Sequence, residues 1–164
     1  MRAMFRGPLR ALTLTQPWAG LVASGIKLIE NRPKPPPAVM IGQRFAIHAS
    51  REIDQLVFDR IYEIDPGLRP ELATTREQSR WHQLARIKSA IIGVGTLLSF
   101  AEDLEGLRAS GCVSEDQERW YFPPSIGYML ADVRPLERPI PIKGMLGFWT
   151  IPHDEAAEIT RQLQ

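Results

Sequence analysis

Three charged side chains that could do chemistry fall close together, Lys27, Glu30 and Arg32 in the segment GIKLIENR. A lysine can contact a phosphate as a point charge, and a buried lysine loses part of its basicity and can act as a base or nucleophile. A neighbouring carboxylate could orient the amine or carry a proton. The alternative is a solvated segment whose Glu30–Arg32 ion pair contributes less than about 1 kcal/mol. These residues are the candidate catalytic pair, Lys27 and Glu30, with Arg32 as a nucleic-acid contact.

The spacing of these three residues poses a geometric question. Glu30 and Arg32 are two positions apart, so a regular strand would place both on one face. Lys27 would then point to the other face, unless the strand begins only after it. One arrangement brings Lys27 and Glu30 together in a cleft and directs Arg32 toward its rim. The sequence leaves these alternatives open.

A second polar group ends the next predicted strand, where His48, Ser50 and Arg51 follow an apolar run. Ser50 and Arg51 near a helix N-terminus could hold a phosphate. Ser50 is equally suited to be only an N-cap. A single histidine at a strand end is more often structural than catalytic. We predict that all three contact nucleic acid, and the structural roles just described are the alternatives.

Aromatic residues would supply the other half of a nucleic-acid site, because exposed rings stack on unpaired bases. Trp18 and Trp149 sit in apolar periodic stretches and are predicted to be core residues. Trp120 and Tyr128 flank a proline-rich turn and are the predicted stacking residues. Lys143 adds a cation beside a glycine.

Composition limits the function classes. The chain has 164 residues, enough for one domain, and a net charge of +1, which gives no global attraction to nucleic acid or membranes. One cysteine and three widely spaced histidines predict no metal site, and no cofactor is expected. No apolar run approaches the roughly 20 residues of a membrane span, and the basic start lacks a signal-peptide core. We expect a cytoplasmic protein with a flexible basic arm at residues 1–10 and a single domain at residues 11–164.

The candidate residues need elements that position them. Residues 12–15 alternate as in a half-buried strand, and Pro17 suits the first turn of a short helix, with Thr15 or Gln16 as its cap. Gly25 suits the left-handed residue that ends the helix. The other predicted strands are residues 43–48, 90–100, 119–122, 127–133 and 147–151, and the predicted helices are residues 52–64, 71–87 and 154–163. Short strands broken by glycines and prolines indicate an α+β fold, a mixed β-barrel of about six strands with peripheral helices.

Four blocks of this sequence are similar to a known family. The run GIKLIENR has the form GxKxxExR, which resembles the signature of ASCH domains, named after activating signal cointegrator homology. The surrounding blocks TQPWAGLVASGIKLIENRP, IGQRFAIHASR and GYMLADVRPLERPIPIKGMLGFWTIP resemble those of small standalone bacterial members, so the resemblance covers residues 12–152. It implies a PUA-like β-barrel with a cleft beside the signature and a role connected with RNA.

The functions that the resemblance implies are not uniform. Some members of the family are RNA-binding modules, one bacterial type is ribonuclease-like, and another is an amidohydrolase that deacetylates an acetylated cytidine. In the amidohydrolases the signature lysine, here Lys27, is catalytic, and a threonine stands at the position of Glu30. The prediction is therefore a protein that binds RNA or a modified nucleoside, with a ribonuclease as its enzymatic version. The amidohydrolase is one alternative. The other is a protein-interaction module that uses the proline-rich residues 33–37 and the aromatic C-terminal block.

Overall fold

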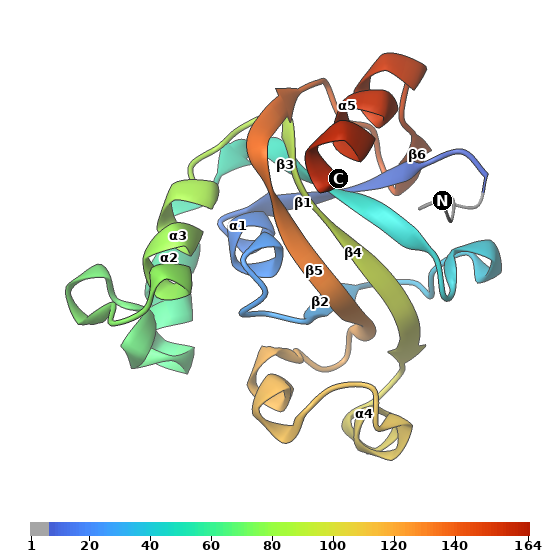
Figure 1. Cartoon of the computed structure of the whole chain (residues 1–164). Helices are drawn as coiled ribbons and strands as arrows, with labels where there is room; N and C mark the ends of the chain where they lie inside the picture. Colours follow the sequence, from blue (N-terminus) through green and yellow to red (C-terminus); the bar gives the residue numbers. More distant parts are fainter. Residues whose placement is uncertain (1–6) are drawn as a thin grey trace.

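The computed structural model describes residues 7–164, except for the side chains of residues 77 and 78. Within that range, six strands form one twisted sheet (Figure 1): β1 (Arg10–Gln16), β2 (Ile29–Arg32), β3 (Arg44–Ile53), β4 (Ala90–Ala101), β5 (Ile126–Pro141) and β6 (Phe148–Thr150). The α-helices of the same range are α1 (Trp18–Ala23), α2 (Gln55–Ile64), α3 (Arg76–Leu84), α4 (Leu104–Ser110) and α5 (His153–Leu163). Short 3-10 turns cover Ala38–Met40, Pro66–Leu68, Pro70–Leu72 and Glu115–Trp120.

The strand order is β2-β5-β4-β3-β1-β6. β1 runs parallel to β3, and the other neighbouring strands are antiparallel. The predicted α+β class with about six strands is confirmed. The predicted closure is not seen, because no backbone ladder among the described residues joins β2 to β1 or β6. The sheet is therefore open along one seam, between β2 and β1.

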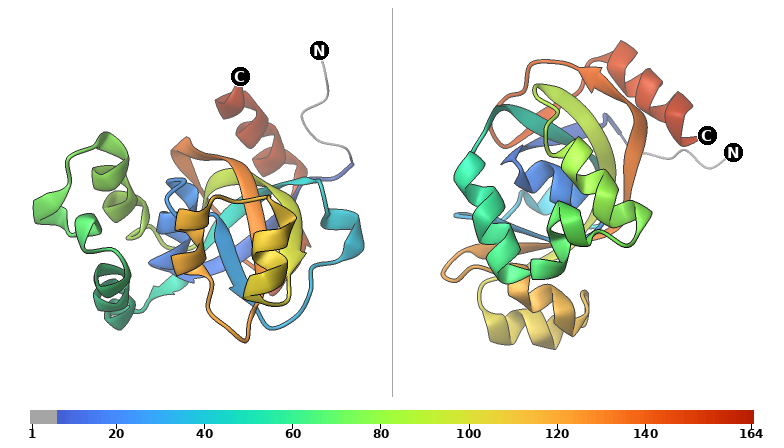
Figure 2. Two further views of the ribbon diagram at one scale, coloured as in Figure 1. Left: turned by 90° about the horizontal axis from the view of Figure 1, so that it is seen from below. Right: turned by 90° about the vertical axis from the view of Figure 1, so that its left-hand side faces the viewer.

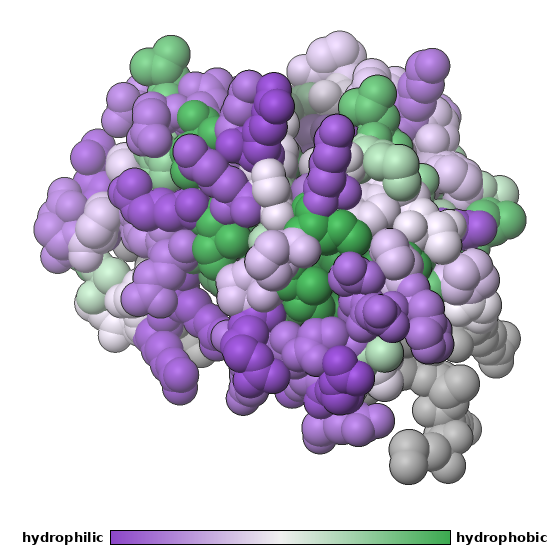
Figure 3. All heavy atoms as spheres, turned by 90° about the horizontal axis from the view of Figure 1, so that it is seen from above, coloured by the Kyte–Doolittle hydropathy of each residue, from purple (hydrophilic) through white to green (hydrophobic). Residues whose placement is uncertain are grey.

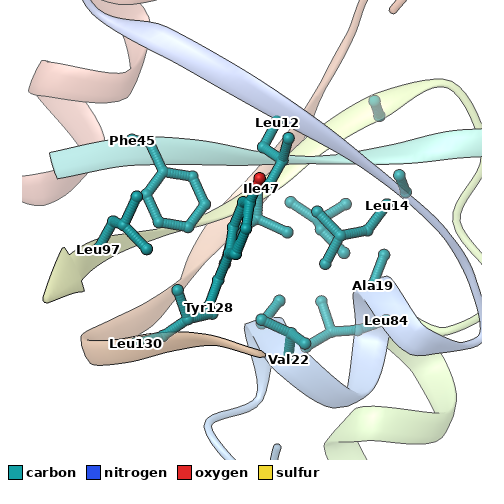
Figure 4. Packing of buried hydrophobic residues seen from close by; sticks show 14 of the residues in the cluster. Leu12, Leu14, Ala19, Val22, Phe45, Ile47, Leu84, Leu97, Tyr128 and Leu130 are labelled. Carbon is teal, nitrogen blue, oxygen red and sulfur yellow. The ribbon is translucent and has the colours of Figure 1, made fainter. Parts of the chain in front are cut away.

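Successive side chains of a strand point to opposite faces of the sheet. In this protein both faces are covered by buried hydrophobic clusters. Leu12, Phe45 and Ile47 pack with Val22 of α1 in one core cluster. Figure 4 shows the labelled strand residues of this cluster converging with side chains from α1 and α3. The other face packs against α5, and its residues include Leu9, Ala11, Ala46, Ile91, Val94, Leu136, Trp149 and Ile159. The strand predicted at residues 90–100 is confirmed as β4, which is buried on both faces over its first six residues.

The helices α2 and α3 stand side by side, away from α5, and α4 lies at another end of the sheet (Figures 1 and 2). The buried Gln16 links α1 to α3, because its Nε2 donates to the carbonyls of Leu84 and Ile87, both at 2.8 Å. Its Oε1 accepts from the Gly20 amide at 2.9 Å. The N-cap position of α1 is Pro17, however, so neither Thr15 nor Gln16 is the predicted cap. Gly20 packs so closely on Ala85 that a Cβ there would lie 2.3 Å from the Ala85 nitrogen.

The predicted helix start at residue 52 is wrong by three residues. β3 continues to Ile53, because Ile53 pairs with Gln16 of β1. α2 begins only after Asp54, whose side chain accepts from the Leu56 amide at 3.0 Å. Ser50 and Arg51 therefore belong to a strand, and neither caps a helix nor lies at a helix N-terminus.

Other boundaries also differ from the predictions. The second predicted helix, residues 71–87, is reduced to α3 after a separate turn at Pro70–Leu72. The predicted aromatic strand, residues 119–122, is the end of the 3-10 turn Glu115–Trp120 and a loop. Its backbone is bonded by side chains of neighbouring segments instead of a strand ladder. Of the predicted arm, residues 1–6 lie outside the described residues, and Arg10 already begins β1.

β5 is a single strand of 16 residues despite three prolines. β2 pairs only with residues 126–129 of β5, so Pro135, Pro139 and Pro141 lie where one side of β5 has no partner strand. This placement agrees with the expectation that prolines confine pairing to an edge.

Hydrophobic surface is dispersed. The large exposed hydrophobic residues come from four separate segments and are Val39, Leu56, Leu72 and the adjacent pair Met145 and Leu146. Figure 3 shows one face that is mainly hydrophilic with hydrophobic groups between. Among residues 7–164 no helix has the length and apolarity to cross a membrane, and no cluster of three or more metal-ligating side chains occurs in the same range.

Candidate functional site

A pocket with a volume of about 270 Å³ lies where the sheet is open. We call it the seam pocket. β1 and β2 supply its two walls, α1 and α2 supply one residue each, and the loop before β5 supplies a ring. Its lining residues are Thr13, Leu14, Thr15, Trp18, Lys27, Glu30, Asn31, Arg32, Arg60 and Phe122. The three charged residues singled out in the signature thus meet in one pocket.

Lys27 enters this pocket because the strand starts after it. Gly25 adopts a left-handed conformation, with φ of +83°, which ends α1 and redirects the chain. The Lys27 amide donates to the Leu21 carbonyl at 3.3 Å, and β2 begins only at Ile29. The alternation of a strand therefore does not apply to Lys27, and it lines the same pocket as Glu30. This resolves the geometric question that the spacing left open.

The Lys27 amine is removed from water, since the residue is only 1% exposed. Its Nζ donates to the Ile29 carbonyl and lies 5.2 Å from the centroid of Trp18 and 5.8 Å from that of Phe122. Burial lowers the pKa of Lys27 below its ordinary value, the carboxylate of Glu30 opposes this, and the positive charges of Arg32 and Arg60 add to the lowering. The site therefore favours the neutral amine, the form that accepts a proton.

Glu30 and Arg32 share the pocket without forming an ion pair with each other. The Oε2 atom of Glu30 and the Nε of Arg32 are buried and have no hydrogen-bond partner among the described residues. Such groups typically cost about 1–3 kcal/mol each. The other end of Arg32 is fixed, because its guanidinium donates to the Thr13 carbonyl at 2.9 Å and so bridges the seam. One buried acceptor and one buried donor among the pocket-lining residues are therefore left without a partner.

Two side-chain amides hold the loop that carries Phe122. Asn31 donates to the Trp120 carbonyl and accepts from the Phe122 amide, both at 2.8 Å. Gln117 accepts from the Leu28 amide at 2.7 Å and donates to the Ile26 carbonyl at 3.0 Å. These bonds fix both flanks of Lys27 relative to the ring of Phe122.

Arg60 is a pocket residue that sequence reasoning did not single out. It projects from α2, and its guanidinium carbon lies 4.2 Å from the centroid of Phe122. One signal for it exists in the sequence. Arg60 falls at helical spacing from Val57 and Ile64, next to Ile61, so it lies along the apolar stripe of the predicted helix. A positively charged side chain beside the buried stripe of an amphipathic helix can extend into a neighbouring site.

The expected division of the aromatic residues is reversed. Trp120 is 0% exposed and Tyr128 is 6% exposed, so both predicted stacking residues are core residues. The Tyr128 hydroxyl donates to the Lys34 carbonyl at 2.8 Å. Trp18, predicted for the core, is partly exposed and lines the pocket with Phe122, their centroids 5.5 Å apart. Trp149 is buried as predicted.

The remaining predicted contacts lie outside the seam pocket. Ser50 bonds the Glu52 carbonyl, Arg51 is exposed beside Glu52, and Lys143 is exposed after the end of β5. His48 is buried, with its ring nitrogens 3.2 Å from the Thr13 hydroxyl and 2.7 Å from the Ile142 carbonyl. These bonds attach the loop after β5 to β1 and β3. His48 therefore has the structural role that a single histidine at a strand end more often has.

His48 should make folding stability sensitive to acid. Burial lowers the pKa of His48 in the folded protein below the ordinary value of 6.5, so the unfolded chain binds its proton first as the pH falls. The stability is therefore fully present above about pH 6.5 and decreases below it, by at most about 1.4 kcal/mol per pH unit for one proton. Urea unfolding at a series of pH values should show this slope, and His48→Gln should remove it. An unchanged slope in the variant would contradict the assignment.

The comparisons with known proteins give the fold. No family model and no curated protein matches the sequence. The structure is similar to the crystal structure of ASCH from Zymomonas mobilis, with a TM-score of 0.51, 18% sequence identity and 94% of each chain covered. A serine-to-alanine mutant of that protein matches with a TM-score of 0.52 and 17% identity over 94% of this chain and 95% of that one. A tyrosine-to-phenylalanine mutant matches with a TM-score of 0.51 and 18% identity over 94% of this chain and 97% of that one. Matches across nearly the whole length at this level of identity establish the architecture, and this chain has the fold of the small standalone bacterial ASCH protein.

Proposed function

We propose that the protein binds single-stranded RNA through the seam pocket and cleaves it, with Lys27 as the proton acceptor. The observation that supports this most directly is a buried lysine in a pocket lined by two aromatic rings, Trp18 and Phe122. An unpaired base is planar and stacks on such rings. A lysine that only held phosphate would gain most from being charged and hydrated, whereas burial favours the neutral amine that a general base requires.

The proposed reaction uses the 2′-hydroxyl group of RNA. Lys27 takes the proton of this hydroxyl while its oxygen forms a bond to the neighbouring phosphorus. The bond from phosphorus to the 5′-oxygen breaks, that oxygen leaves with a proton from water, and a 2′,3′-cyclic phosphate remains. The positive charge of Arg32, which lines the pocket, stabilises the negative charge that accumulates on the phosphate oxygens. The charge of Glu30 stabilises the ammonium that forms on Lys27.

A panel of substrates tests this proposal. Purified protein is incubated with single-stranded RNA, with DNA of the same sequence and with acetylcytidine, beside a Lys27→Ala variant. We expect cleavage of RNA alone, because DNA lacks the attacking hydroxyl, and no cleavage by the variant. Release of acetate that depends on Lys27 would support the amidohydrolase instead. The absence of both turnover and RNA binding at low salt would favour the protein-interaction module.

The pH dependence of cleavage should respond to Glu30. Activity requires the neutral amine, so the rate should rise as the pH increases through the pKa of Lys27. The Glu30 carboxylate raises that pKa, and Glu30→Gln should therefore move the rising limb of the pH–rate profile to lower pH. The plateau rate should also fall, because a weaker base accepts the proton less readily. A limb that moves to higher pH, or stays in place, would contradict this role; Glu52→Gln, an exposed carboxylate outside the pocket, is the matched control.

A further inference from the structure

The seam pocket holds more positive than negative charge. Lys27, Arg32 and Arg60 line it, and Glu30 is the one carboxylate among its described lining residues. No ion pair in the described part of the chain involves Arg32 or Arg60. Even with Lys27 neutral, two arginine charges face a single carboxylate. The pocket is therefore suited to a ligand that carries negative charge as well as a planar ring.

Arg60 is prepared to hold such a charge. Its guanidinium carbon lies 4.2 Å from the centroid of Phe122, and the residue as a whole is exposed to solvent. Contact with the ring restricts the guanidinium, which lowers the cost of ordering it around an oxyanion. Arg32, whose buried Nε has no partner among the described residues, lines the same pocket. The same ring of Phe122 lies 5.8 Å from the Lys27 amine, so an anion at Arg60 would be close to the reactive group.

We infer that Arg60 is a phosphate-binding residue, which makes the pocket selective for phosphorylated ligands over free nucleosides. This inference rests on the proposed function, which supplies the ring and the phosphate chemistry. An arginine fork fits phosphate oxygens with two parallel hydrogen bonds. The phosphate is either the terminal group of a nucleotide or a diester within RNA. Arg60 takes the role for which the sequence offered Arg51, whose side chain is exposed outside the pocket.

Calorimetric titrations test the inference with four ligands: nucleosides, their 5′-monophosphates, inorganic phosphate, and a short single-stranded RNA with hydroxyl ends. Wild-type protein should bind the monophosphates more tightly than the nucleosides, and inorganic phosphate should compete with them. Arg60→Gln should weaken binding of the phosphorylated ligand by about 10- to 100-fold, the usual value of a charged hydrogen bond, and leave nucleoside binding unchanged. If Arg60→Gln loses affinity for the monophosphate alone, Arg60 binds a terminal phosphate. If the variant loses affinity for the oligonucleotide, Arg60 binds a diester.

Three controls separate the outcomes. Arg60→Lys keeps the charge without the fork and should recover part of the affinity. Arg51→Gln should change nothing, because that exposed arginine lies outside the pocket, and thermal unfolding confirms that each variant is folded. If the ligands bind but Arg60→Gln affects nucleosides and nucleotides equally, or neither, the inference is overturned while RNA binding stands. If wild-type protein binds no nucleoside, nucleotide or RNA, the proposed function falls as well.

Discussion

Lys27→Met should reduce RNA cleavage by about 10²- to 10⁴-fold, the usual contribution of a general base, without destabilising the protein. Methionine has nearly the length of lysine and fills the same space between Trp18 and Phe122. It removes the proposed proton acceptor. It also removes an amine that is 1% exposed and whose charged form is costly to bury. We therefore expect an unchanged or higher free energy of unfolding in urea beside the loss of turnover.

This pair of measurements distinguishes a base from a structural lysine. If Lys27 mainly served packing through its bond to the Ile29 carbonyl, the methionine variant would lose stability and activity together. If Lys27 mainly held phosphate, the affinity of the variant for RNA would fall, but the rate at which bound RNA is cleaved would not. Lys34→Met is the matched control, since Lys34 is exposed in the loop after β2. Retained cleavage in Lys27→Met at all pH values would contradict the proposed mechanism.

Gly20→Ala should destabilise the fold by about 3 kcal/mol or more, although alanine is the better helix former. A Cβ at this position would lie 2.3 Å from the backbone nitrogen and 2.5 Å from the Cα of Ala85. Backbone atoms cannot rotate away as a flexible side chain does, so α1 and α3 must separate. Separation would also strain the bonds from Gln16 to the Leu84 and Ile87 carbonyls. Urea unfolding measures the loss.

A second helical glycine provides the comparison. At Gly106 in α4 the nearest atom to an added Cβ is the side-chain oxygen of Asp103, at 3.2 Å. That side chain can move slightly, so Gly106→Ala should change the free energy of unfolding by less than about 1 kcal/mol. Similar effects of the two substitutions would show that α1 and α3 are not in close contact.

The sequence predicts the framework of the site better than its lining. Period-two alternation, Pro17 and Gly25 are local signals, and they correctly indicate β1, α1 and the turn that delivers Lys27. Lys27, Glu30 and Arg32 line one pocket, although their spacing alone left open whether Lys27 shares a face with the other two. These features depend on neighbours within a few residues, which a sequence displays directly.

The lining of the pocket depends on contacts between distant segments. Trp18 lies in an apolar stretch and Trp120 follows a charged run, yet Trp120 is the ring that is buried. Only the packing around the 3-10 turn Glu115–Trp120 decides this. Asn31 fixes that turn across about ninety residues of sequence, at separations of 89 and 91. Arg60 reaches Phe122 from a helix whose orientation no local pattern specifies. Ser50 and Arg51 were predicted next to a helix because the pairing of Ile53 with Gln16 is likewise invisible in the sequence.

The pairing of Arg60 with Phe122 across the pocket has a consequence for how such a protein can change. Lys27 and Glu30 are held by α1 and β2, elements that pack into the core, whereas Arg60 extends from the α2–α3 pair that stands beside the sheet. Reactivity and choice of ligand are therefore carried by separable parts of the chain. Substitutions on α2 around Arg60 could retune which molecules are accepted while the reactive amine stays where it is, so new specificities would be reachable without rebuilding the reaction centre.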